Sequence, residues 1–123
     1  MTPPLVVIDA ANVVGSVPDG WWKDRFGATE RLRDNLAGLH STGLATVPPP
    51  VDVVLVVEGK ARGVEGTEGV RVISAPGSGD DAIVDLVRAE CADRQCVVVT
   101  ADRGLRSRVT ALGAAVLGPS TVR

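Results

Sequence analysis

The chain has 123 residues, 45% of them hydrophobic, and a net charge of −2, which fits one domain over residues 1–123 with a core of two packed layers. The slightly negative charge excludes a basic nucleic-acid coat, so contact with a polyanion would need a local arginine cluster or bound cations. Only Trp21, Trp22 and Phe26 are aromatic, which leaves Val, Leu, Ile and Ala to build the interior.

Short apolar runs flanked by turn formers predict strands that are buried on both faces. In chain order these runs are LVVI at 5–8, VVLVV at 53–57, VRVI at 70–73, CVVVT at 96–100 and a weaker AAVL at 114–117. Amphipathic patterns predict helices between them, at 28–39, 80–93 and 102–112. Strands that alternate with helices predict an α/β fold with a mainly parallel sheet of about five strands.

One connection leaves the direction of a strand open. Residues 59–69, GKARGVEGTEG, show no helical pattern and give barely enough chain for a crossover between parallel strands. A hairpin there would make the strand at 70–73 antiparallel. We favour the parallel arrangement.

The cysteines and the single histidine argue against a zinc site. Cys91 and Cys96 lack C-x-x-C spacing, and His40 is the only histidine. We expect two reduced, buried thiols in a cytoplasmic protein. The sequence shows no signal peptide and no run long enough to span a membrane.

Acidic residues follow four of the predicted strands. Asp9 ends the first strand and Glu58 the second, Asp80 and Asp81 come after the third, and Asp102 follows the fourth. Because the carboxyl ends of parallel strands meet at one edge of a sheet, we expect these side chains to converge there.

A cluster of carboxylates favours a hard cation. Carboxylates that lie close together repel one another unless a cation neutralises them. Oxygen ligands without nearby His or Cys favour Mg²⁺ or Mn²⁺. Such ions can activate a water and clamp a phosphoryl group, so hydrolysis of phosphodiesters is the natural use of the site.

Each acid also has a purely structural interpretation. Asp81 could complete a capping box with Ser78 as N-cap, and Asp80 could be an N-cap or complement the helix dipole. Asp102 could cap the helix that follows it. Asp9 is harder to explain structurally, because it interrupts an apolar strand where a charge is costly without a partner.

Four other residues also have a structural interpretation beside a functional one. Glu58 could be an exposed acid at a strand end, and Asn12 could supply a left-handed turn. One of the adjacent Trp21 and Trp22 could stack on an unpaired base, whereas such a pair more often covers a helix start with one ring packed down.

Three motifs together resemble a known family. VVIDAANVVGS resembles the hydrophobic-D-x-x-N-x-x-G opening of NYN/YacP-like domains, a branch of the PIN-domain ribonuclease superfamily. DDAIVDL is similar to the family's second motif, with Asp81 in the metal-binding place and Asp85 as the trailing acid. VVVTADRGL resembles the hydrophobic-T-S-D motif, with Asp102 in the last acidic place. The motifs occur in the family's order, from residue 5 to about residue 118.

The resemblance implies a three-layer PIN-like fold with strand order 3-2-1-4-5 and an endoribonuclease dependent on Mg²⁺ or Mn²⁺. It makes Asp9, Asp81 and Asp102 the catalytic residues and core metal ligands, and Asp80 an additional ligand or a residue that orients a water.

The resemblance also assigns substrate contacts, with one departure. Asn12 and Thr100 would hydrogen-bond the scissile phosphate, a neighbouring carboxylate or a metal-bound water. The Gly-Tyr pair common between the family's Asp and Asn is Ala10-Ala11 here, so an aromatic contact is missing.

Basic residues near the acids are candidate substrate contacts. Arg103 and Arg106 stand three apart on the last predicted helix and could hold phosphates or form an exposed basic face. Lys60 and Arg62 lie in the loop after Glu58, at the same predicted edge.

These residues predict single-stranded RNA as the partner. We expect no association with a membrane. A homodimer or a protein partner stays open. The competing class is a catalytically inert PIN-like module that binds RNA or protein. An aspartyl phosphatase requires an acid at the position of Ala11, so this class is disfavoured. No G-x-G-x-x-G follows the first strand, which argues against dinucleotide binding.

Overall fold

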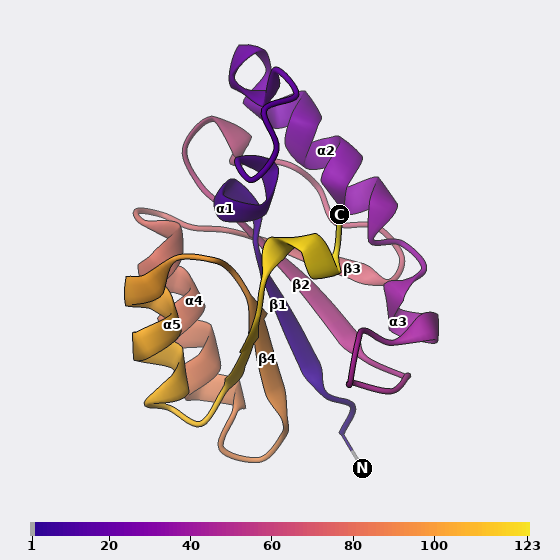
Figure 1. Ribbon diagram of the computed structural model, residues 1–123, viewed down its shortest axis with the longest axis vertical. Helices are drawn as coiled ribbons and strands as arrows, with labels where there is room; N and C mark the ends of the chain where they lie inside the picture. The colour runs from indigo at the N-terminus through magenta and orange to yellow at the C-terminus, as the bar shows by residue number, and fades with distance from the viewer. Residues whose placement is uncertain (1) are drawn as a thin grey trace.

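The computed structural model describes residues 2–123, which build one five-stranded sheet (Figure 1). Its order is β3-β2-β1-β4-β5, and every neighbouring pair is parallel. The strands are β1 (Leu5–Asp9), β2 (Asp52–Val57), β3 (Val70–Ser74), β4 (Cys96–Val99) and β5 (Ala115–Leu117). The predicted α/β class and strand order are therefore confirmed.

The strand at 70–73 runs parallel to its neighbour, so the hairpin alternative is wrong. The connection after β2 folds into the short 3₁₀ helix η2 (Gly59–Ala61) before it returns to the start of β3. About a dozen residues suffice for a crossover between adjacent parallel strands.

Helices fill the remaining connections. They are α1 (Ala10–Val14), η1 (Trp21–Lys23), α2 (Arg25–Asn35), α3 (Leu39–Thr42), α4 (Gly79–Glu90), α5 (Arg103–Thr110) and η3 (Pro119–Thr121). The predicted helix at 28–39 begins three residues earlier, because the carboxylate of Asp24 accepts a hydrogen bond from the Gly27 N–H at 2.9 Å and caps it. Within residues 2–123, no helix has the length and hydropathy needed to cross a membrane.

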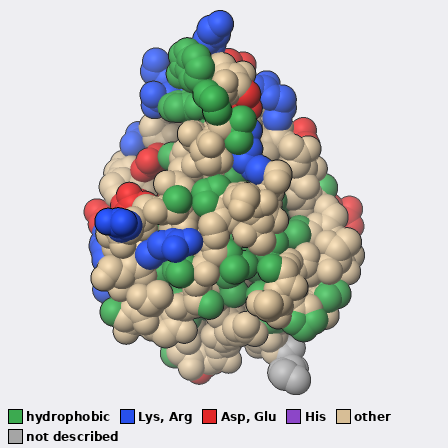
Figure 2. Space-filling model, in the orientation of Figure 1, with side chains coloured by type: hydrophobic (Ala, Val, Ile, Leu, Met, Phe, Trp, Pro, Cys, Tyr) green, Lys and Arg blue, Asp and Glu red, His purple; other side chains and the backbone are tan. Residues whose placement is uncertain are grey.

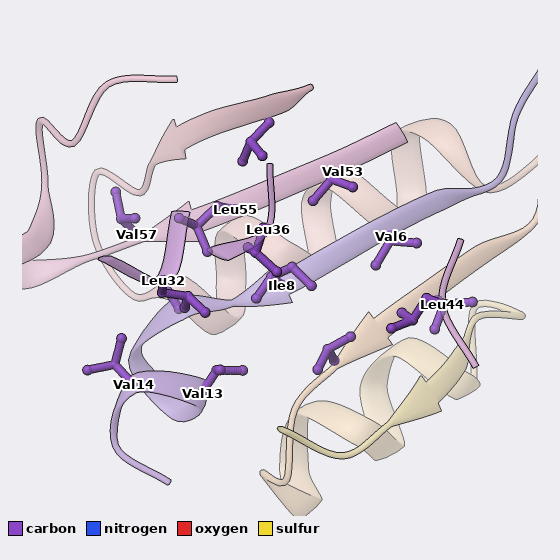
Figure 3. Packing of buried hydrophobic residues seen from close by; sticks show 14 of the residues in the cluster. Val6, Ile8, Val13, Val14, Leu32, Leu36, Leu44, Val53, Leu55 and Val57 are labelled. Carbon is purple, nitrogen blue, oxygen red and sulfur yellow. The ribbon is translucent and has the colours of Figure 1, made fainter. Parts of the chain in front are cut away.

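The sheet is covered on both faces, with α2 and α3 on one side and α4 and α5 on the other (Figure 1). Val6 and Ile8 of β1 pack with Leu32 of α2 and with Leu36, which directly follows that helix, and Figure 3 shows this cluster from close by. The alternate β1 residues, such as Val7, pack on the α4 and α5 side. Because successive strand side chains point to opposite faces, a Val-rich strand fits between two helical layers.

The chain changes direction across the sheet between β1 and β4. From β1 it continues to β2 and β3 on one side, and it then returns to β4 and β5 on the other. In open parallel sheets, ligands bind in the crevice at the carboxyl ends of the strands that flank such a switch point. Asp9 is the last residue of β1 and stands at this place.

Cys91 and Cys96 form a disulfide, so the expectation of reduced thiols is wrong. Cys91 follows the last turn of α4, and Cys96 is the first residue of β4. The short turn between them brings their Cα atoms within 5.7 Å, a separation suited to a disulfide.

Candidate active site at the carboxyl edge of the sheet

The carboxylate of Asp9 is buried at the end of the central strand. Only 6% of the residue is exposed, and its Oδ2 accepts a hydrogen bond from the Thr100 hydroxyl at 2.8 Å. Burial raises the pKa of Asp9 from 3.8 to about 6; hydrogen bonds from Thr100 and the Asn12 backbone oppose this rise, and the charges of Asp80 and Glu58 add to it. Asp9 is thus a buried acid with a pKa raised to about 6, and such perturbed groups cluster at functional sites.

Thr100 connects two of the predicted acids. Its fully buried hydroxyl donates to Asp9 and accepts a hydrogen bond from the backbone N–H of Asp102 at 3.1 Å. A neighbouring carboxylate was one of the three partners that the resemblance implied for Thr100. The side chain of Arg106 lies against the same segment and donates its Nε–H to the Thr100 carbonyl at 2.8 Å. Thr100 and Arg106 therefore hold the segment that carries Asp102 in place.

Asn12 holds the loop between β4 and α5. Its Oδ1 accepts a hydrogen bond from the backbone N–H of Ala101 at 2.8 Å. The residue lies inside α1 and has no positive φ, so the left-handed-turn interpretation is wrong. Because α1 spans only one turn, periodicity in the sequence did not reveal it.

The carboxylate of Glu58 reaches the amino end of α4 and accepts a hydrogen bond from the Gly79 N–H. The interpretation of Glu58 as a simple exposed strand-end acid is therefore wrong. A Cβ at position 79 would lie 2.7 Å from Glu58 Oε2, so glycine lets the carboxylate approach this closely. The free N–H groups and dipole of a helix start favour such an anion.

The two adjacent aspartates of α4 face different surroundings. Ser78 caps the helix by accepting a hydrogen bond from the Asp81 N–H at 3.2 Å, which confirms its predicted role. Asp80 is half-buried, and its pKa is raised by burial and then by the charges of Asp102 and Glu58. Asp81 is 69% exposed and forms an ion pair with Arg108 at 3.0 Å. Neighbouring residues on a helix point about 100° apart, so only Asp80 turns toward the other acids.

Asp102 caps α5, as one of its two interpretations predicted. Its Oδ1 accepts a hydrogen bond from the Leu105 N–H at 2.8 Å. Its charge also acts on Asp80. Capping and membership of the site are thus compatible. We call Asp9, Glu58, Asp80 and Asp102 the acid group.

The acid group fits a hard divalent cation in its chemistry but offers a small ligand set. Its donors are all carboxylate oxygens, and two of its members have raised pKa values partly because other acids lie near. Within residues 2–123, however, no three His, Cys, Asp or Glu side chains are arranged to hold one ion together. Mg²⁺ commonly binds through one or two carboxylates and keeps several waters, so a pair from this group is sufficient.

Sequence reasoning missed Arg108. It placed four other basic residues near the edge of the sheet but did not reveal their contacts. Arg108 comes from α5 and contacts Asp81 of α4, a pairing that depends on how the two helices pack. Lys60, Arg62 and Arg103 are exposed, and Arg62 also lines a cavity beside the acid group. Arg106, as described above, is engaged with the backbone.

Two crystal structures of Rae1 (YacP) from Bacillus subtilis share this architecture. One, of a mutant, matches with a TM-score of 0.76 and 20% sequence identity, over 99% of this chain and 72% of that one. The other matches with a TM-score of 0.77 and 20% identity, over 95% and 70% of the two chains. The chain has the Rae1 (YacP) fold. This confirms the YacP-like resemblance at the level of the fold, although no protein-family model and no curated protein matches the sequence.

Replacing Thr100 with valine is expected to destabilise the fold by about 2 kcal/mol at pH 7.5, because the buried Asp9 carboxylate loses a charge-assisted hydrogen bond. At pH 4 the Asp9 carboxyl is protonated, so the loss should be smaller. Urea unfolding at both pH values measures the difference.

Thr29→Val is the matched control. Thr29 is also buried, but its hydroxyl donates to the neutral carbonyl of Arg25 at 2.8 Å. Its replacement should cost about 1 kcal/mol at either pH. If Thr100→Val costs no more than Thr29→Val at pH 7.5, then Thr100 does not stabilise a charged Asp9.

Proposed function

We propose that this chain is a divalent-metal-dependent endoribonuclease that hydrolyses phosphodiester bonds of single-stranded RNA. The observation that carries the proposal is the buried, hydrogen-bonded carboxylate of Asp9, at the switch point of a ribonuclease-like fold and beside Asp80 and Glu58. A charge placed there lowers stability, and functional sites are where such a cost is retained.

Asp9 and Asp80 are the proposed principal ligands of Mg²⁺ or Mn²⁺, since they experience the strongest effect of burial and of neighbouring acids. The bound cation would supply an activated water and stabilise charge on the phosphate. Asp102, whose charge acts on Asp80, is proposed as a further ligand, although no three such side chains are arranged around one ion within residues 2–123. Asp81 keeps the ligand role that the resemblance implies, although it is paired with Arg108 in this structure.

The remaining predicted residues divide into support and substrate contact. Thr100 and Arg106 hold the β4–α5 segment, and Asn12 anchors its first residue. Lys60 and Arg103 are exposed cations near the edge of the sheet and are proposed to contact RNA phosphates. Because the chain as a whole is slightly acidic, RNA affinity should depend on a few such residues and on salt.

The alternative is a catalytically inert module that binds RNA or protein. The ion pair between Arg108 and Asp81 favours it, because it neutralises an acid that the family motif gives to the metal. The absence of a three-ligand group within residues 2–123 points the same way.

RNA cleavage in Mn²⁺ separates these functions and tests which aspartate of α4 matters. Asp80→Asn is expected to lower the cleavage rate by about 100-fold or more, the scale of losing a key electrostatic group in an active site. Asp81→Asn tests the motif's assignment in parallel, with a loss of similar size if Arg108 gives way to the metal.

Asp85→Asn is the control on the same helix, because Asp85 is 76% exposed and its one ion pair within residues 2–123 is with Arg88. It should cleave like the unmodified chain. Equal cleavage by the unmodified protein and by Asp80→Asn would indicate a contaminating nuclease. Saturable RNA binding without any cleavage would favour the inert module.

A further inference from the structure

A cavity of ≈ 350 Å³ opens beside the acid group. Its walls come from α1, η1, the start of α2, the segment after β2 and the loop before α4, and the residues that matter here are Val14, Trp21, Arg25, Glu58, Arg62 and Gly77. Its volume falls within the usual range of about 300–1,000 Å³ for ligand sites. Because Glu58 belongs to both, the cavity adjoins the acid group.

One wall of the cavity is an aromatic ring stacked with a cation. The guanidinium of Arg25 lies 5.2 Å from the centroid of the Trp21 ring. Trp21 is half-buried and packs against the core, whereas Trp22 is 53% exposed and meets it edge-on at 5.8 Å. The expectation that one ring of this pair packs down is confirmed, and the packed ring is the one that lines the cavity.

Two arginines at the cavity have no acidic partner among residues 2–123. Neither Arg25 nor Arg62 forms an ion pair within the described part of the chain, and both side chains are exposed. Figure 2 shows hydrophobic side chains gathered at the upper end of the molecule, with both basic and acidic side chains around them, where Figure 1 places the chain between α1 and α2. The charged residues of the lining are these two arginines and Glu58, so the cavity carries one more positive than negative charge and can accept a ligand with an anionic part.

We infer that this cavity is a subsite for one unpaired nucleotide of the RNA substrate. Bases of single-stranded RNA stack on aromatic rings and on arginine planes, and Trp21 with Arg25 offers both. Arg62 holds a phosphate of the same nucleotide, and the adjoining phosphodiester then lies at Asp9 and Asp80. The inference rests on the proposed function and adds the requirement for an unstacked base, which a regular duplex does not provide.

Trp21 itself can report on this subsite. Trp22→Phe leaves Trp21 as the only tryptophan, since the chain has two. This protein is titrated in EDTA, so that no cleavage occurs, with a five-nucleotide adenosine RNA, with the same RNA lacking its central base, and with AMP. We expect a saturable change in Trp21 fluorescence with the intact RNA and about tenfold weaker binding without the base.

Arginine variants in the same background test the cationic walls. Arg25→Ala and Arg62→Ala should each weaken RNA binding by about tenfold. Arg31→Ala is the matched control, because Arg31 is an exposed residue of α2 outside the cavity, and it should change binding by less than about twofold.

The outcomes separate this inference from the proposed function. Equal binding of the two RNAs, unchanged binding in both cavity variants, or no saturable fluorescence change would overturn the subsite. AMP binding as tightly as RNA would replace it with a site for free nucleotides. RNA that binds as expected but is not cut in Mn²⁺ would leave the subsite standing and remove the nuclease. Cleavage with unchanged KM in Arg25→Ala and Arg62→Ala would leave the nuclease standing and remove the subsite.

Discussion

Asp9→Asn is expected to abolish RNA cleavage and, in the metal-free protein, to increase the free energy of unfolding at pH 7. The amide has nearly the same shape and can still accept the Thr100 hydrogen bond, but it carries no charge for a cation. Burial raises the pKa of Asp9 from 3.8 to about 6. Holding the carboxylate ionised at pH 7 therefore costs about 3 kcal/mol of folding free energy, and the variant avoids that cost.

The gain in stability should depend on pH with a definite sign. A carboxyl with a raised pKa contributes stability that is complete below pH 3.8 and is lost as the pH rises through about 6. The advantage of Asp9→Asn should thus be small at pH 4 and largest above pH 6. Asp80 adds to the trend in the unmodified chain, since its pKa is raised in the same direction.

Urea unfolding in EDTA at pH 4 and pH 7.5 measures this difference, and an RNA cleavage assay in Mn²⁺ measures the activity. Asp85→Asn removes an exposed carboxylate and should change neither property by much. A variant at position 9 that is less stable at pH 7.5 than the unmodified chain would show that the charge of Asp9 is well accommodated, and the trade of stability for function would be wrong.

The strands were accessible from simple sequence patterns, whereas their order was expected only from the resemblance to NYN/YacP-like domains. The runs around Val6, Leu55 and Val98 are apolar on both faces, which suits a sheet between two helical layers. Asp9 was recognisable as a functional candidate because a charge at the end of such an apolar run is costly unless it has a partner. The caps at Ser78 and Asp102 were predictable from residue type and position alone.

Features that depend on tertiary packing were not accessible in this way. The contact of Arg108 with Asp81 joins two helices that are adjacent only in the folded protein. Glu58 reaches the start of α4 because Gly79 leaves room for it, which no local pattern encodes. The orientation of Asp80 toward Glu58 and Asp102 likewise depends on how α4 packs, which the capping role of Ser78 alone does not fix.

Mn²⁺ or Mg²⁺ is expected to raise the melting temperature of the unmodified chain and to leave that of Asp9→Asn nearly unchanged. A cation that binds only the folded state stabilises it by about 2.7 kcal/mol at 100 times Kd, which is roughly 10 °C for a domain of this size. It also relieves the repulsion between acids, which adds to the effect of burial in raising the pKa values of Asp9 and Asp80. Because protons compete with the cation for Asp9, the increase should shrink as the pH falls below about 6. NaCl at equal ionic strength separates binding from screening, since a screening effect would appear equally in both proteins and with both salts. Equal increases in the unmodified chain and in Asp9→Asn would move the cation away from the carboxyl end of β1, and with it the proposed active site.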